Sequence, residues 1–572
     1  MNDIRRTILW VVFGFSMILL WDQWQVSNGR PATFLPQPPK AASVAGTTNT
    51  AKPTPAAVPA ASNASQANNS VPSSSVPNAA TTVVAASNLP PAPNSAVAAP
   101  AKELIEVTTD VLKLGFDAEG GTLVRAELLK QRDLVNKEIN MVLLQQSKDR
   151  LYSAQTGLIG AAGVPNHKTA MTLVSPDRTF KAGADTLTLR FESAGPDAKL
   201  VKTYTLKRGA YDMVVTHEVT NTGAADITPQ LYVQLIRDGN KPAGESDFYS
   251  TFTGPVVYSE KKKYEKIEFS DIEKNKADFE KTAVGGYVGM VQHYFFSSWI
   301  AADGASHENF VRKIDTNLYA AGMILPFKAI AAGQTQKMDT KLFVGPQEEK
   351  TLEALAPGLE LVKDYGYFTI LSKPLFWVID QLHKAIGNWG WAIVAVVVLL
   401  KIVFYWFNAK AYQSMGKMKA INPKIMEMRE RLKDNPQQIQ SEMMRIYKEE
   451  KVNPMGGCLP IIIQIPVFIA LYWVLLSSVE FRGAPWILWI KDLSAPDPWF
   501  ILPVLMTLSS LLQTWLNPTP PDPMQAKMMW IMPLMFSFMF FFFPAGLVLY
   551  WLVNNILSIA QQWVINKRLG VN

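Results

Sequence analysis

The sequence predicts a polytopic α-helical membrane protein that also carries a β-sandwich domain outside the cytoplasm. Two observations support this fold class. Hydrophobic residues make up 48% of the 572 residues and concentrate between Trp389 and Ile565. Between about Glu103 and Gly345, by contrast, apolar and polar residues alternate in short runs separated by turn residues. A chain of this length is also too long for one domain.

The first 24 residues contain an apolar stretch, Ile8 to Trp21, preceded by Arg5 and Arg6. A cleaved signal peptide and an uncleaved membrane anchor both fit a stretch of this length. The stretch runs into bulky tryptophans rather than the small residues of a cleavage site, so we interpret residues 1–24 as an anchor. The two arginines keep its N-terminus in the cytoplasm by the positive-inside rule.

Residues 25–102 are mostly Ala, Pro, Ser, Asn, Thr and Val, and Lys52 is the only charged residue between Ala41 and Ala101. Such a segment has too little apolar surface to offset the entropy cost of ordering the chain. The composition therefore predicts a disordered tether between the anchor and the next domain.

Residues 103–352 are predicted to form an antiparallel β-sandwich. The period-2 runs that predict strands are Thr186 to Phe191, Val201 to Leu206, Tyr211 to Val219 and Leu231 to Ile236. The orientation of the anchor places this domain outside the cytoplasm.

Residues 353–388 are predicted to form an amphipathic helix, in which apolar residues recur at steps of three and four. These residues are Phe368, Leu371, Leu375, Ile379 and Leu382. We expect Pro374 to kink or split the helix. A helix of this type before a membrane span fits the membrane interface, and packing on the β-domain is an equally good interpretation.

Five further spans follow the amphipathic helix, and with the anchor they make six transmembrane helices. They are predicted at residues 389–408, 453–478, 498–517, 528–543 and 544–566. The loop at 409–452 has ten Lys or Arg against six Asp or Glu, and the tail at 567–572 carries Lys567 and Arg568. Both segments are therefore expected in the cytoplasm, as are both termini.

The loop at 409–452 is predicted to form a helical hairpin. Apolar residues follow helical steps on both sides of Asn435 and Pro436, which suit the N-cap and the first position of the second helix. The alternative is a passive connector, which does not require about forty residues.

Lys401 interrupts the apolar run of the span at 389–408. A charge at this depth costs about 2.5 to 3.5 kcal/mol on insertion scales. None of the five apolar segments contains Asp, Glu or His to pair with it. We therefore predict a hydrated cavity open to the cytoplasm, while a lysine that snorkels to the headgroups is the alternative. Polar residues expected to help line the cavity are Gln464, Ser509, Ser510, Gln513, Asn554, Asn555 and Ser558.

Several classes of protein lack support in the sequence. There is no nucleotide-binding loop, hydrolase motif or close His/Cys cluster, and the single cysteine, Cys458, forms no intramolecular disulfide. We therefore expect no enzyme activity, no metal, no cofactor and no nucleic-acid recognition. An uncoupled polar groove that shelters part of an inserting chain is the favoured function, and an uncoupled channel or transporter is the alternative.

Three motifs resemble the membrane protein insertases of the YidC type, in order and spacing over roughly residues 360–568. They are Lys448-Glu449-Glu450-Lys451-Val452-Asn453-Pro454-Met455-Gly456-Gly457-Cys458-Leu459-Pro460 with Gln464 to Phe468, then Asp522-Pro523-Met524-Gln525, and Phe543-Pro544-Ala545-Gly546 with Leu547 to Trp551. The anchor, tether and β-domain resemble the Gram-negative members. The resemblance implies an inner membrane protein with a five-helix insertase core, both termini in the cytoplasm and a periplasmic β-supersandwich.

The resemblance also implies a groove open to the cytoplasm and the lipid. Lys401 stands where the family usually has an arginine, so it keeps the charge and loses the two-pronged donor. The substrate-contact residues implied are Gln464, Ile465, Pro466, Phe468, Tyr550 and Trp551. The implied partners are nascent membrane proteins, the lipid bilayer, the Sec translocon and the ribosome.

Overall fold

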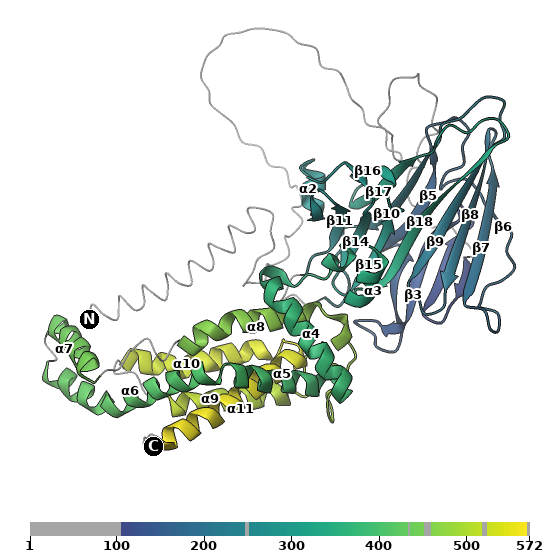
Figure 1. Cartoon of the computed structure of the whole chain (residues 1–572). Coiled ribbons are helices and arrows are strands. Elements are labelled where there is room, and N and C mark those ends of the chain that lie inside the picture. Colours follow the sequence, from purple (N-terminus) through teal and green to yellow (C-terminus); the bar gives the residue numbers. More distant parts are fainter. Residues whose placement is uncertain (1–103, 246–250, 433–434, 451–458, 518–522, 569–572) are drawn as a thin grey trace, which may run out of the picture. The chain divides into compact units, whose positions relative to one another are not determined.

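A computed structural model describes residues 104–245, 251–432, 435–450, 459–517 and 523–568 (Figure 1). The predicted anchor and tether lie outside the described residues. The described chain forms two compact units that meet in sequence between Gly345 and Pro346. The strands belong to the first unit and the long helices to the second.

Two nine-stranded sheets form the first unit. The first sheet, in spatial order, contains β1 (Ile105–Thr108), β2 (Leu112–Asp117), β3 (Thr122–Arg132), β4 (Asn140–Gln146), β5 (Leu151–Ile159), β10 (Gln230–Asp238), β17 (Leu318–Pro326), β16 (Ser306–Asp315) and β13 (Thr282–Val284). The second contains β12 (Lys263–Lys266), β11 (Gly254–Ser259), β14 (Tyr287–Gln292), β15 (Phe295–Ile300), β18 (Thr335–Pro346), β9 (Asp212–Asn221), β8 (Ala198–Lys207), β7 (Thr186–Ala194) and β6 (Thr172–Leu173). A short helix, α2 (Phe269–Glu273), follows β12.

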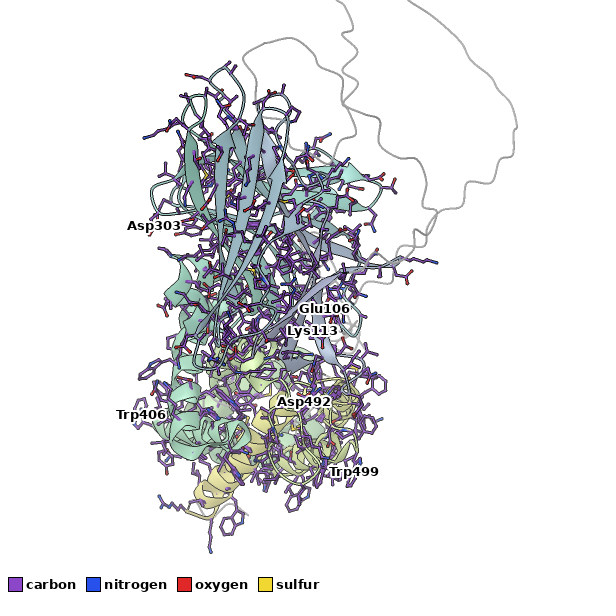
Figure 2. All side chains as sticks on the ribbon, turned by 90° about the vertical axis from the view of Figure 1, so that its right-hand side faces the viewer. Glu106, Lys113, Asp303, Trp406, Asp492 and Trp499 are labelled. Atoms are coloured by element: carbon purple, nitrogen blue, oxygen red, sulfur yellow. The ribbon has the colours of Figure 1, made fainter. Side chains whose placement is uncertain are left out.

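The strands form where the sequence alternates. In β9 every second residue is buried and the residues between them are only partly covered, as expected for one face of an antiparallel sheet packed on a core. At one edge, Lys113 of β2 lies 3.0 Å from Glu106 of β1, and Figure 2 labels this pair.

The two sheets are linked by hydrogen bonds through the core. The Trp299 indole of β15 donates to the Gln234 carbonyl of β10 at 3.1 Å, and the Tyr152 hydroxyl of β5 donates to the Met290 carbonyl of β14 at 3.3 Å. Buried donors of this kind need a partner, and here each finds one on the facing sheet. The predicted β-sandwich is therefore confirmed.

The second unit is helical. Its elements are α3 (Glu349–Leu355), η1 (Leu359–Val362), η2 (Gly366–Phe368), α4 (Thr369–Ile386), α5 (Trp389–Val403), α6 (Tyr405–Arg431), α7 (Pro436–Glu449), α8 (Leu459–Ser477), η4 (Val479–Phe481), α9 (Ile501–Leu516), α10 (Pro523–Phe540) and α11 (Ala545–Arg568). One apolar core joins α4, α5, α8, α9 and α11, and it includes Ile379, Val396, Leu471, Met506 and Leu549.

Helix α4 is not split at Pro374, which lies in its second turn. A proline so near the start removes the hydrogen bond to the Ile370 carbonyl, and Ile370 is exposed, so the helix continues. The helix packs on the helical unit, since Phe376 and Ile379 are buried in its core and the Ser372 hydroxyl donates to the Ala470 carbonyl of α8 at 3.2 Å.

The helical region predicted as the first of the five spans is bent rather than straight. Helix α5 ends at Val403, and α6 starts at Tyr405 with its axis turned by 68°. The break falls in a run of β-branched and aromatic residues, which lose side-chain freedom in a helix. The Gln561 side chain of α11 donates to the Tyr405 carbonyl at 3.4 Å and so links α11 to the start of α6.

Length and composition identify this bent pair, α5 with α6, as able to cross a membrane together, whereas no single described helix meets both criteria alone. Three shorter apolar helical stretches lie at Gln464–Ser477, Ile501–Leu516 and Ala526–Phe540.

Helices α6 and α7 form the predicted hairpin. The Asn435 side chain caps α7 by accepting from the Gln438 backbone N–H at 3.3 Å, and Pro436 begins the helix. An apolar seam holds the two helices together, and its buried members are Ile421, Ile425, Met428, Ile446 and Tyr447.

Candidate functional site

Lys401 lies in the last turn of α5 and points toward α11. Its ammonium donates to the Ser558 hydroxyl at 2.6 Å, and Ser558 in turn donates to the Asn554 carbonyl one turn earlier at 2.7 Å. The charge therefore has a neutral hydrogen-bond partner in the bundle. A hydroxyl that donates a hydrogen bond to a carbonyl is polarised, and its oxygen is then a better acceptor for a cation.

A small, partly open pocket surrounds this lysine, and residues of α5, α6, α8 and α11 line it. Its cavity volume is about 30 Å³, which is room for very few water molecules. Its lining combines amide and hydroxyl groups with apolar side chains, and consists of Val397, Leu400, Lys401, Phe404, Asn408, Gln464, Val467, Tyr550 and Asn554. These lining residues include no carboxylate and no histidine, so Lys401 is the only charge at the pocket.

An aromatic cluster adjoins the pocket on α8 and α11. The Phe468 ring lies 4.2 Å from the Trp551 ring and 6.1 Å from the Tyr550 ring, measured between centroids. Gln464 lies one helical turn before Phe468 and shares its face of α8. The structure therefore brings Gln464, Phe468, Tyr550 and Trp551 together, and Gln464 and Tyr550 line the pocket with Lys401.

The other two implied contact residues differ in position. Ile465 is 47% exposed on the surface of α8. Pro466 lies within α8 and is partly buried. Since successive helical residues point about 100° apart, Ile465 lies on a different face of α8 from Gln464.

Ser509 and Gln513 do not line the pocket. Ser509 of α9 is buried against the other side of α11, where the Asn555 amide donates to its hydroxyl at 3.3 Å and to the Ser510 hydroxyl at 3.1 Å. Gln513 lies one turn further along α9 and is partly buried. The adjacent residues Asn554 and Asn555 thus serve two different helix contacts, with Asn554 alone at the pocket.

Asn408 and Phe404, which are not among the residues predicted from the sequence, also line the pocket. Asn408 is only 8% exposed. It lies on α6, beyond the 68° bend, so helical spacing from Lys401 on α5 does not predict its position. The places of both Asn408 and Phe404 at the pocket depend on that bend.

Within the described residues, no group of three or more His, Cys, Asp or Glu side chains is placed to hold a metal ion. The chemistry available at the pocket is therefore hydrogen bonding and the field of one cation. Such a site can bind polar or acidic groups of another chain.

Two protein families match consecutive parts of the chain. Residues 104–378 match the family described as the YidC periplasmic domain, and residues 381–571 match the family described as 60Kd inner membrane protein. A crystal structure titled as an active YidC insertase with the first transmembrane domain resolved has 18% sequence identity and a TM-score of 0.37, and the match covers 81% of this chain and 92% of that one.

Relatives of the chain share about half of its residues along its full length. The membrane protein insertase YidC of Cupriavidus necator is 52% identical over 568 residues, which cover 99% of this chain and 98% of the relative. The membrane protein insertase YidC of Ralstonia nicotianae is 51% identical over 574 residues, which cover 100% of this chain and 99% of the relative. At this identity and coverage, the chain belongs to the YidC family of membrane protein insertases.

Proposed function

We propose that the chain inserts other membrane proteins into the bilayer, and that the Lys401 pocket receives the polar part of the inserting segment. The observation that supports this most is the arrangement of Lys401, Ser558 and the amides of Asn408, Gln464 and Asn554 at one pocket in an otherwise apolar bundle. The relatives are named membrane protein insertases. Their names give no support to the alternative of a channel or transporter.

The pocket lowers the cost of moving polar groups into hydrocarbon. An unpaired backbone or side-chain polar group costs several kcal/mol there, and the pocket supplies donors and acceptors at that depth. The ammonium of Lys401 attracts acidic residues of the segment to be translocated. Nothing in the sequence supplies a nucleotide-driven step, so release into the lipid is driven by the hydrophobicity of the new span.

The small pocket volume has a consequence for this mechanism. A cavity of about 30 Å³ holds water and not a peptide segment. Helices around the pocket therefore separate when a substrate enters. The Phe468 and Trp551 rings are only partly buried, whereas Tyr550 is buried, so an entering segment contacts Phe468 and Trp551 before Tyr550.

We further propose six spans with both termini in the cytoplasm and the β-domain in the periplasm. The positive balance of the loop at 409–452 supports this orientation. The α6–α7 hairpin then projects into the cytoplasm, where it is available to the ribosome. The proposal also includes the domain boundaries given in the sequence analysis. It further names the Sec translocon and the ribosome as partners.

Site-specific photo-crosslinking tests the pocket as the substrate site. A photoreactive residue at Phe468 is expected to capture a nascent single-span protein during active synthesis. The matched control is Leu508 of α9, a lipid-exposed leucine outside the pocket. Equal capture at Phe468 and Leu508, or no capture at Phe468 during synthesis, would contradict the proposal.

A further inference from the structure

A second pocket lies on the segment between α8 and α9, at the surface of the helical unit. It has a volume of about 600 Å³ and is lined by Leu488, Trp489, Lys491, Pro498 and Trp499. This volume falls within the roughly 300 to 1,000 Å³ of pockets that hold small organic ligands. None of its lining residues belongs to the Lys401 pocket, so the proposed function leaves it without a role.

Two stacked tryptophans form one wall of this pocket. The Trp489 and Trp499 rings are nearly parallel, at 10°, with centroids 5.7 Å apart. The Trp489 indole donates to Asp497 Oδ1 at 3.0 Å, which fixes the orientation of that ring. Trp499 is 66% exposed, and Figure 2 labels it at the outer surface of the helical unit.

Two aspartates hold the segment in one shape. Asp497 is almost fully buried and also accepts from the backbone N–H groups of Trp499 and Leu502, at 3.0 and 2.7 Å. Asp492 accepts from the backbone N–H of Gly483 and from the N–H and hydroxyl of Ser494. Both carboxylates are therefore engaged with the segment itself, and the pocket is preorganised.

The backbone is strained where it presents apolar side chains outward. Leu488 and Phe500 have positive φ angles of 52° and 56°, a left-handed conformation that is unfavourable for residues with a bulky side chain. Leu488 is nonetheless 80% exposed. Strain that turns a leucine away from the protein indicates an external apolar contact rather than core packing.

The segment lies at the end of the bundle where α11 begins. The Ala545 and Gly546 N–H groups donate to the Ala495 and Leu493 carbonyls at 2.8 and 2.9 Å. The hairpin of α6 and α7 lies at the other end of the helical unit (Figure 1). In a protein of this family, tryptophans at the ends of apolar helices lie at the level of the lipid headgroups. The pocket therefore faces the headgroup and upper acyl region of the bilayer.

We propose that this pocket binds a phospholipid of the bilayer. An acyl chain lies along Leu488 and the stacked tryptophans, and the headgroup phosphate meets the exposed ammonium of Lys491. An apolar wall beside one cation matches the two parts of a phospholipid, and the neighbouring carboxylates of Asp492 and Asp497 are turned into the segment. Bound lipid then fixes the ends of α8 and α9 at a set depth. This inference goes beyond the insertase function and stands independently of it.

Photolabelling of the full chain tests the proposal. The protein is reconstituted in vesicles of phosphatidylethanolamine and phosphatidylglycerol with a trace of phosphatidylglycerol that carries a photoreactive acyl chain, and adducts are mapped by peptide mass spectrometry. The segment from Leu488 to Trp499 is expected to take more adduct than the lipid-exposed face of α10 around Phe538. Lys491→Glu should lower its yield about fivefold, the ratio that corresponds to about 1 kcal/mol for one lysine at an anionic headgroup.

Two controls distinguish the site from bulk lipid. Lys491→Arg should keep the yield, and Lys527→Glu, which changes an exposed lysine of α10, should not alter it. With the wild-type chain, a photoreactive diacylglycerol that lacks phosphate should label the segment less than α10. A yield equal to that of α10 and insensitive to the charge at Lys491 would overturn the proposal. Capture of a protein by the segment in native membranes, with no lipid adduct, would overturn it as well.

Discussion

At the scale of single residues, the function depends on how Lys401 is satisfied. Its ammonium has three donors, and Ser558 accepts from one of them. The remaining donors are available to the pocket and to whatever enters it. An arginine at this position would present a planar fork of donors. A lysine presents a compact charge on a flexible stem, which can follow an acidic group as it moves.

The charge of Lys401 is the first prediction. Lys401→Arg should retain insertion, whereas Lys401→Glu should reduce insertion of substrates with acidic translocated segments by about tenfold or more. A hydrogen bond to a charged group contributes about 1.5 to 3 kcal/mol, and the charge reversal adds repulsion. Protease protection of a single-span test protein in reconstituted vesicles measures the effect.

Lys410→Glu is the matched control for this prediction, because Lys410 of α6 is exposed and lies over the Trp406 ring, outside the pocket. It should leave insertion near the wild-type level. Wild-type insertion by Lys401→Glu would show that the charge is dispensable.

At the scale of elements, a buried ion pair fixes the segments around α4 to the end of α8. Lys363 follows η1, and its side chain is fully buried. Its ammonium donates to both oxygens of Glu480 in η4 at 3.1 Å and lies 3.7 Å from the Phe376 ring centre of α4. Burial lowers the pKa of Lys363, and the carboxylates of Glu480 and Glu349 oppose that shift.

Removal of this buried charge is the second prediction. Lys363→Met keeps the apolar contact with Phe376 but leaves Glu480 without its partner, and it should destabilise the docking of α4 by about 3 to 5 kcal/mol. Hydrogen exchange of the Thr369–Ile386 peptide in the detergent-solubilised full chain measures this. The double variant Lys363→Met with Glu480→Gln should lose less docking stability than the two single variants lose in sum.

A more exposed ion pair, between α3 and α4, provides the comparison. Lys350 lies 2.7 Å from Asp380 of α4, and the lysine side chain is 63% exposed. Lys350→Met should destabilise the docking of α4 by about 1 kcal/mol or less. Water surrounds most of the lysine, and Lys384 remains 3.0 Å from Asp380 as its partner. If Lys350→Met and Lys363→Met lower the stability of α4 docking by similar amounts, the role assigned to the buried pair is contradicted.

At the scale of the whole molecule, the β-unit contains basic groups that its core holds away from water. The Lys202 ammonium lies between the Gly120 and Thr156 carbonyls, 2.7 Å from each, and the His217 imidazole lies 3.1 Å from the Thr156 hydroxyl. Burial lowers the pKa of Lys202 to about 7. Burial, and the nearby Lys202 charge, lower the pKa of His217 and of His167 to about 3.

These shifts predict that the β-unit loses stability in acid. Each histidine has a pKa of about 6.5 when unfolded and about 3 when folded. The unfolded state therefore binds more protons between these values, and the free energy of unfolding falls as the pH drops through that window. From pH 6.5 to 4.5 the loss is roughly 2 kcal/mol for each histidine. For Lys202 the corresponding loss falls between about pH 10.5 and pH 7.

Urea titration of the full chain in detergent, read out by a short hydrogen-exchange pulse on β-strand peptides, measures this third prediction. His217→Phe should flatten the dependence on pH between 6.5 and 4.5. His293→Gln is the control, because His293 lies between β14 and β15 and is only partly buried. An unchanged slope in His217→Phe would contradict the assignment.

Much of the fold was predictable because local patterns specify it. The alternating runs around Leu189 and Val215 became β7 and β9, and Asn435 with Pro436 began α7. Half-buried strands and capped helices are recognisable from the pattern of apolar and capping residues in a short stretch of sequence. The effect of Pro374 was not predictable in this way. A proline leaves one helix carbonyl without its partner, and whether the helix continues depends on whether that carbonyl is exposed to another partner.

The site was predictable in part. The exceptional charge of Lys401 among apolar residues and the family motifs led to Gln464, Phe468, Tyr550 and Trp551. Ser509 and Gln513 were chosen by polarity alone, and the structure places them away from the pocket. Polarity says that a residue needs a partner but does not say which helix supplies it.

The sequence by itself determined the class of the protein, the β-sandwich, the charge inside the apolar region and the family. Each of these depends on composition, on periodicity or on motifs that are read within a short stretch. Only the tertiary structure decided that Lys401 meets Ser558, that Asn554 and Asn555 serve different contacts, and that α5 and α6 are bent at Phe404. The contacts of Lys401 and Asn555 join residues 157 and 46 positions apart, so they depend on how the helices are rotated against one another. Packing of the whole unit sets that rotation and the bend.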